Sequence, residues 1–207
     1  MKIHEPTTTM TDFLIAGCTV WFSGRLLLLD IDSFHFWWSV VFSTISLGAF
    51  LGAIRHGWGP SLGSDWTRLL NLATYAFVGL TAATMIIATL LHYYAYPRLK
   101  IVLILLGLSW LIYVWIARHR MSFSTVVYYY VPALIMSGAL VAWNSQGHYS
   151  DGEIWIMVGM MISLLAGGVQ IGKFSLHRHF NHNDLYHVIQ LAGLFMIYYG
   201  VRLIPAA

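Results

Sequence analysis

Four histidines, two asparagines and an aspartate lie close together near the C-terminal end of the chain, in residues 177–187. A long apolar segment follows directly. Ionisable side chains are costly beside a membrane-length apolar run, so they usually serve a function there. On a helix, Asn183 and Asp184 share a face with His187, at spacings i, i+4 and i, i+3. His182 joins that face only if it lies in the non-helical residues that precede the first turn.

Histidines far apart in the sequence suggest a zinc site. Neutral imidazole is the commonest protein ligand for zinc, and three protein ligands with one water form a catalytic zinc site. His56 closes the second apolar segment, while His182 and His187 open the last one. Seven membrane crossings would bring all three to one membrane face. Asp65 opens the third segment at that same face, and a carboxylate there can hold the bound water or orient a ligand ring.

Each of these residues also has a purely structural interpretation. Asn183 and Asp184 fit a helix N-cap, because their side chains can accept backbone N–H groups of the first turn. His187 fits a buried, hydrogen-bonded histidine. His56 can complement the dipole at a helix C-terminus, and Asp65 fits a helix cap. The sequence leaves both interpretations open.

The composition is that of a membrane protein. Of the 207 residues, 58% are hydrophobic and 9% are charged, whereas soluble chains carry about 25% charged residues. The net charge of +3 does not indicate nucleic-acid binding, because the basic residues lie singly or in pairs at segment ends, where membrane orientation explains them. The single cysteine, Cys18, excludes a disulfide framework and a thiolate metal site. The polar first residues argue against a cleavable signal peptide.

Short charged clusters separate seven apolar segments, each roughly the 17–25 residues needed to cross about 30 Å of hydrocarbon. We therefore expect an all-α membrane protein, a seven-transmembrane helix bundle that forms a single domain over residues 1–207. The expected spans are approximately residues 13–29, 36–55, 67–94, 101–117, 123–143, 154–173 and 184–204. Residues 1–12 are expected to form a polar lead, and residues 57–64 a Gly/Pro/Ser loop. Glu5 and Asp12 could reach the same face of the bundle as the histidines, although short polar leads are usually only solvated.

The basic residues predict the orientation. Seven fall on the side of the N-terminus, namely Lys2, Arg55, Arg68, Arg118, Arg120, Lys173 and Arg178, and four fall on the opposite side, namely Arg25, Arg98, Lys100 and Arg202. The positive-inside rule then makes the N-terminus cytoplasmic. We expect an integral, multi-pass protein of a bacterial inner membrane.

The positions of the histidines resemble a known superfamily. Seven spans, a histidine closing the second and a histidine motif opening the seventh are similar to the CREST superfamily, which includes alkaline ceramidases and the progestin and adipoQ receptors. The superfamily's Ser-x-x-x-His pattern falls on Gly52 and His56, so the hydroxyl is missing here. Its His-x-x-x-His pattern falls on Asn183 and His187, with His182 immediately before and able to substitute for the missing histidine.

The resemblance implies a divergent intramembrane hydrolase. Zn²⁺ would be held by His56, His182 and His187, with a water in the fourth position. The expected reaction is metal-assisted hydrolysis of a lipid amide or ester that enters sideways from the bilayer. The superfamily's third-span aspartate has two candidate matches, Asp65 and Asn71.

The resemblance also suggests roles for the neighbouring polar residues. Asp184 or Asp65 would act as general base or orient a ligand, and Asn183 could stabilise the oxyanion. The alternative is a non-enzymatic receptor, sensor or scaffold on the same frame, with or without metal, and the missing hydroxyl and displaced histidine favour it. Transport is less favoured because no internal repeat is evident. Haem binding is less favoured because it needs facing histidines deep in the bundle, and these histidines lie near helix ends. Nothing in the sequence indicates an oligomeric state.

Overall fold

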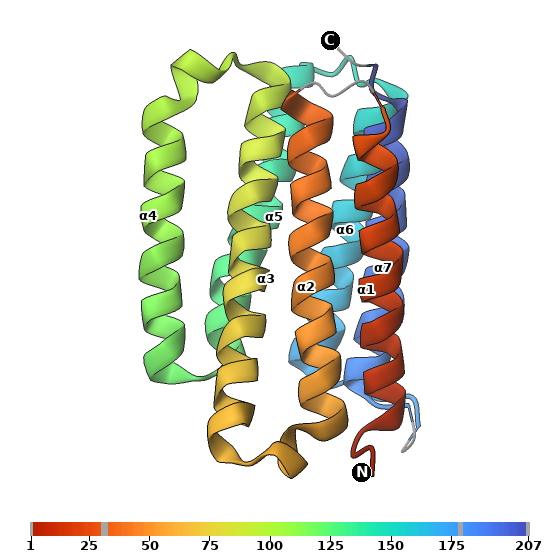
Figure 1. The fold of residues 1–207 in the computed structure, drawn as a ribbon. Helices are drawn as coiled ribbons and strands as arrows, with labels where there is room; N and C mark the ends of the chain where they lie inside the picture. Colours follow the sequence, from red (N-terminus) through yellow and green to blue (C-terminus); the bar gives the residue numbers. More distant parts are fainter. Residues whose placement is uncertain (1, 30–32, 178–179, 206–207) are drawn as a thin grey trace.

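The computed structural model describes residues 2–29, 33–177 and 180–205, and within these ranges the chain forms seven helices and no β-strand. The helices are α1 (Pro6–Leu27), α2 (Ser33–Leu62), α3 (Ser64–Tyr93), α4 (Tyr96–Arg120), α5 (Phe123–Ser145), α6 (Asp151–Gly172) and α7 (His182–Leu203). They alternate in direction, so that the two ends of the chain lie at opposite ends of the bundle (Figure 1). The expectation of an all-α bundle is confirmed.

Six of the helices close a ring. α1 packs against α2, α2 against α3, α3 against α5, α5 against α6, α6 against α7, and α7 against α1. α4 stands outside this ring and packs against α3 and α5 (Figure 1). The interior of the ring is therefore formed by helices from both ends of the sequence.

Small residues bring α6 and α7 into close contact. A Cβ atom built on Gly159 of α6 would lie 2.5 Å from the carbonyl oxygen of Gly193 in α7. One built on Gly200 of α7 would lie 2.5 Å from the carbonyl oxygen of Gly152 in α6. Such distances leave no room for a side chain, as expected where small residues let two membrane helices approach closely. This contact fixes the position of α7.

Five helices, α2 to α6, are long and apolar enough to cross a membrane. This supports the expectation of an integral membrane protein. α1 and α7 fall short of the same criteria because polar residues occupy the end of each helix that lies beside the N-terminus of the chain. In α1 these are mainly Thr7, Thr8, Thr9, Thr11 and Asp12, and in α7 His182, Asn183, Asp184, His187 and Gln190.

Two helices extend into segments that were expected to be a polar lead and a loop. α1 begins at Pro6, within the expected polar lead, because proline is well suited to the first turn of a helix. α2 continues through Pro60 to Leu62, where a loop was expected, and Gly63 with its φ of 88° makes the turn to α3. The solvated lead is therefore a helix, and Asp12 within it is buried, with 6% of its surface exposed.

Candidate functional site

A cavity of about 290 Å³ lies between the ring helices, in the half of the bundle that contains the N-terminus. All six ring helices contribute to its lining, and α4 does not. Its ionisable lining residues are Asp12 from α1, Arg55 and His56 from α2, and His187 from α7, together with the tyrosines Tyr75, Tyr130 and Tyr186. The ring topology thus brings together groups that are separated by up to 175 positions in the sequence (187 − 12).

His187 is held by two side chains of α1. Its Nδ1 lies 2.8 Å from Oγ1 of Thr11, and its Nε2 lies 3.3 Å from Oδ1 of Asp12. Both His187 and Asp12 are buried. The hydroxyl of Thr11 donates to the backbone carbonyl oxygens of Thr7 and Thr8, so it accepts from Nδ1–H of the ring, and Nε2 shares a proton with the carboxyl group of Asp12. The result is a carboxylate–imidazole pair at the wall of the cavity.

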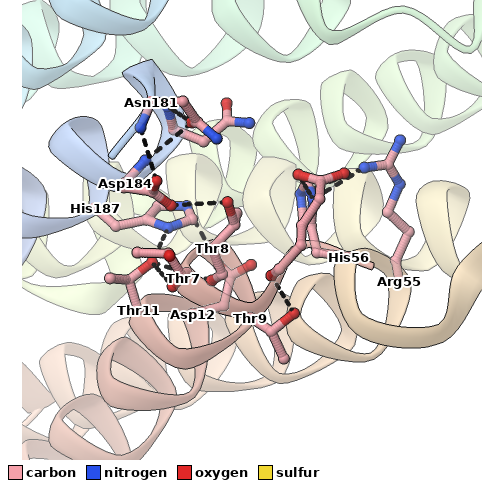
Figure 2. Close-up of polar contacts among 12 residues, drawn as sticks. Thr7, Thr8, Thr9, Thr11, Asp12, Arg55, His56, Asn181, Asp184 and His187 are labelled. Carbon is pink, nitrogen blue, oxygen red and sulfur yellow. Dashed lines mark hydrogen bonds and ion pairs between the residues drawn. The ribbon is translucent and has the colours of Figure 1, made fainter. Parts of the chain in front are cut away.

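Asp184 joins α1 to the start of α7. Its Oδ1 accepts a hydrogen bond of 2.7 Å from the hydroxyl of Thr8, and its Oδ2 accepts one of 2.8 Å from the backbone N–H of Asn181. The side chain of Asn181 in turn accepts from the backbone N–H groups of Asn183 and Asp184, which completes a capping box (Figure 2). Asp184 has no exposed surface, so both of its oxygens are used within the protein.

His56 is held from the N-terminal segment. Its Nδ1 lies 2.9 Å from Oε2 of Glu5, which directly precedes α1, and 3.1 Å from Nη1 of the neighbouring Arg55. The backbone N–H of His4 donates to the carbonyl oxygen of Gly57 over 3.0 Å, so this segment lies against the end of α2. In Figure 2 the labelled residues of α1 lie between His187 on one side and His56 on the other.

Gly52 makes room for Asp12. A Cβ atom on Gly52 would lie 3.3 Å from Oδ2 of Asp12, which is tighter than an ordinary contact. A serine at this position, as in the pattern of the resemblance, would place its side chain directly beside the carboxylate. The serine hydroxyl of the pattern is thus absent at position 52, and the carboxylate of Asp12, from α1, lies in the space beside it.

The structure brings together only some of the residues that the sequence singled out. His56, His187 and Asn183 line the cavity, and Asn183 accepts a hydrogen bond of 2.7 Å from Gln170 of α6. His182 is the half-buried first residue of α7 and does not line the cavity. Asp65 is exposed in the first turn of α3, away from the lining.

The zinc prediction is not tested by these contacts. In the part of the chain that the structure describes, no three His, Cys, Asp or Glu side chains are grouped so as to hold a metal ion. Zinc binding by His56, His182 and His187 therefore stays a prediction. The same is true of the catalytic roles of Asp184, Asp65 and Asn183.

Two residues of the cavity wall, Asp12 and Gln190, were not among the expected site residues. Asp12 was interpreted as part of a solvated lead, although Thr8, Thr11 and Asp12 lie at helical spacing i, i+3, i+4 and so share one face. This shared helix face was the feature of the sequence that could have identified Asp12 as a buried residue. Gln190 lies one turn beyond His187 on α7 and is buried in the cavity wall. Its type and spacing alone did not distinguish it from other polar residues near helix ends.

Comparison with known proteins gives one match. A model described as "Family of unknown function (DUF6962)" matches residues 7–205, a range that covers nearly all seven helices. No curated protein and no solved structure matches the chain.

Proposed function

The chain belongs to DUF6962, a family of unknown function, and for this member we propose a seven-span membrane hydrolase that cleaves a lipid amide or ester in the cavity between the helices. The observation that carries the proposal is the group formed by Asp12, His187 and His56. Two imidazoles and a carboxylate from three helices line one cavity within a bundle of membrane-type helices. Such groups are the usual participants in proton transfer and metal-assisted hydrolysis.

The seven-span topology rests on α1 and α7. Each has 22 residues, which is roughly 33 Å at 1.5 Å per residue and enough to cross the hydrocarbon core. Their polar ends contact one another through Thr8 and Asp184 and through Thr11 and His187, rather than facing lipid. The excess of basic residues at this end of the bundle favours a cytoplasmic N-terminus in a bacterial inner membrane.

The types of side chain in the lining suit a zinc ion, although among the described residues their present positions form no group of three ligands. His56 and His187 would hold it, with Asp12 in the place that the sequence interpretation gave to His182. A metal-ligating histidine usually has its second ring nitrogen engaged by a carboxylate or another polar group. Glu5 contacts Nδ1 of His56 and Thr11 contacts Nδ1 of His187 in this way. Binding would require side-chain movement, because Asp12 lies against Nε2 of His187 and Arg55 contacts the ring of His56.

When bound, zinc would lower the pKa of a water and polarise the scissile carbonyl. Glu5, which is part-exposed beside His56, would accept the proton of the attacking water. Asn183 would donate its side-chain N–H to the oxyanion, because its carbonyl oxygen already accepts from Gln170. Asp184 would position α7 against α1 and take no part in the chemistry.

Fatty-acid release tests the proposal. The chain would be reconstituted in proteoliposomes with a panel of lipid amides and esters, and free fatty acid measured by mass spectrometry. We expect release by the wild type and a loss of at least about a hundredfold in His187→Ala and Asp12→Ala. His148→Ala is the matched control, because His148 is an exposed residue between α5 and α6. Equal rates in all four proteins, or no release from any lipid, would contradict hydrolysis at this site.

A receptor or sensor on the same frame is the second candidate. The observation that favours it is that Nδ1 of both histidines and both oxygens of Asp184 already have partners in the protein. A cavity with such preformed contacts can bind a ligand without turning it over. In that case the wild type would bind a lipid and release no fatty acid from it, and His187→Ala would weaken binding alone.

A further inference from the structure

Gln190 carries a buried acceptor without a partner. The side chain lines the cavity and has 5% of its surface exposed. Its Nε2 donates to Oγ of Ser163 over 3.1 Å, while its Oε1 has no hydrogen-bond partner among the described residues. A buried polar atom normally has one, so an unpaired oxygen beside a cavity points to a missing donor.

Two further residues of the cavity wall share this property. Gln170 donates from Nε2 to Asn183 over 2.7 Å, and its Oε1 has no partner within the described ranges. Oγ1 of Thr74 in α3 also has no hydrogen-bond partner among the described residues. By contrast, Thr81 and Thr84 of the same helix donate to carbonyl oxygens one turn earlier. The described residues contain six such buried unpaired side-chain atoms, and three of them belong to residues that line this one cavity.

These atoms select the kind of group that can satisfy them. An amide oxygen only accepts hydrogen bonds, and a threonine hydroxyl can accept as well as donate. Carboxamides carry no net charge, so they suit a neutral polar group better than an ion. Elsewhere the same cavity is lined by the aliphatic side chains of Ile15, Ile45, Ala49 and Val78, which suit a hydrocarbon chain. The cavity, at about 290 Å³, approaches the range of about 300–1,000 Å³ typical of ligand pockets.

We propose that the ligand of this cavity is an uncharged amphiphile whose head donates at least two hydrogen bonds, from N–H or O–H groups, to Gln190, Gln170 and Thr74. Its hydrocarbon chain lies against the aliphatic lining. The inference rests on the proposed function only for the location of the site and holds whether or not the ligand is cleaved. If it is cleaved, lipids whose heads carry at least two N–H or O–H donors are preferred to lipids whose heads carry none.

The test uses a ligand that hydrolysis cannot cleave. The monododecyl ether of glycerol carries two hydroxyl donors, and methylation removes them one at a time while the oxygens remain as acceptors. Binding of the parent, monomethyl and dimethyl compounds to the full chain in nanodiscs would be measured by calorimetry. We expect affinity to fall about fivefold with each donor removed, which is the size of a typical hydrogen bond.

A substitution in the cavity wall tests whether the preference for hydrogen-bond donors arises from this cavity. Thr74→Val keeps the shape of the side chain and should weaken binding of the parent about fivefold, while leaving the dimethyl compound unaffected. Ser137→Ala is the matched control, because it removes a buried unpaired hydroxyl that does not line the cavity. Equal affinity for the three compounds, no binding of the parent, or equal effects of the two variants would overturn the proposal and leave water as the partner of these atoms.

Binding and turnover give separate results. Donor-dependent binding without fatty-acid release from any lipid would support this inference and contradict the hydrolase. Release from lipids without N–H or O–H donors as fast as from lipids with two such donors would support the hydrolase and contradict the inference.

Discussion

At the scale of single residues, the site depends on α1 side chains that hold two residues of α7. Thr8 donates to a fully buried carboxylate, that of Asp184, and Thr11 contacts the imidazole of His187. A hydrogen bond to a buried ionisable group is among the stronger side-chain interactions, because losing it leaves that group unsatisfied. These contacts therefore stabilise the fold as well as orient the imidazole.

Thr8→Val should lower the free energy of unfolding by about 1–3 kcal/mol, because the valine leaves Oδ1 of Asp184 without its donor. Thr84→Val is the matched control, since the hydroxyl of this equally buried threonine contacts only carbonyl oxygens of its own helix. Thermal unfolding in detergent measures both. A control as destabilised as Thr8→Val would show that the loss comes from the helix itself and not from Asp184.

At the scale of helices, the close contact of α6 and α7 positions His187 and Gln190. Part of this was visible in the sequence: the apolar segments located all seven helices and placed His56 and His187 at the same end of the bundle. The first turns of α1 were misjudged because their threonines and Asp12 read as solvated polar residues, and only their pairing with α7 shows why they are buried. Pairing between helices at opposite ends of the chain leaves no local pattern.

Gly159→Ala should destabilise the protein by about 1–3 kcal/mol, because the new methyl group would meet the backbone of α7 and force the helices apart. Gly168→Ala on the same helix is the control. A Cβ there meets nothing within 4 Å, so alanine should be neutral or slightly stabilising. If both variants unfold alike, the distance between the helices is not limited by Gly159.

At the scale of the whole molecule, the ring of six helices, with α4 outside it, lines a cavity near the side of the N-terminus. Neither the outer position of α4 nor the cavity could be predicted, because all the apolar segments look alike in the sequence. The orientation was predicted from the basic residues and is still a prediction. It predicts that the first residues of α5 face the cytoplasm and that its last residues face the opposite side of the membrane.

Cysteine labelling tests the orientation. In a Cys18→Ser background, a cysteine at Gln146 should react with a membrane-impermeant maleimide added to intact cells, and one at Ser122 only after permeabilisation. The two exposed residues flank α5 and serve as controls for each other. The reverse pattern would place the N-terminus outside, and labelling of both from the same side would contradict a spanning α5.

The proposed hydrolase requires His56, His187 and Asp12 to hold one zinc ion together. Elemental analysis of gently purified protein measures this directly, with His56→Ala, His187→Ala, Asp12→Ala, His182→Ala and the control His148→Ala. We predict about one zinc per chain in the wild type, lost in the first three variants and kept in the other two. Loss in His182→Ala with retention in Asp12→Ala would make His182 the third ligand. Wild type without zinc, or zinc retained in both His56→Ala and His187→Ala, would contradict the claim.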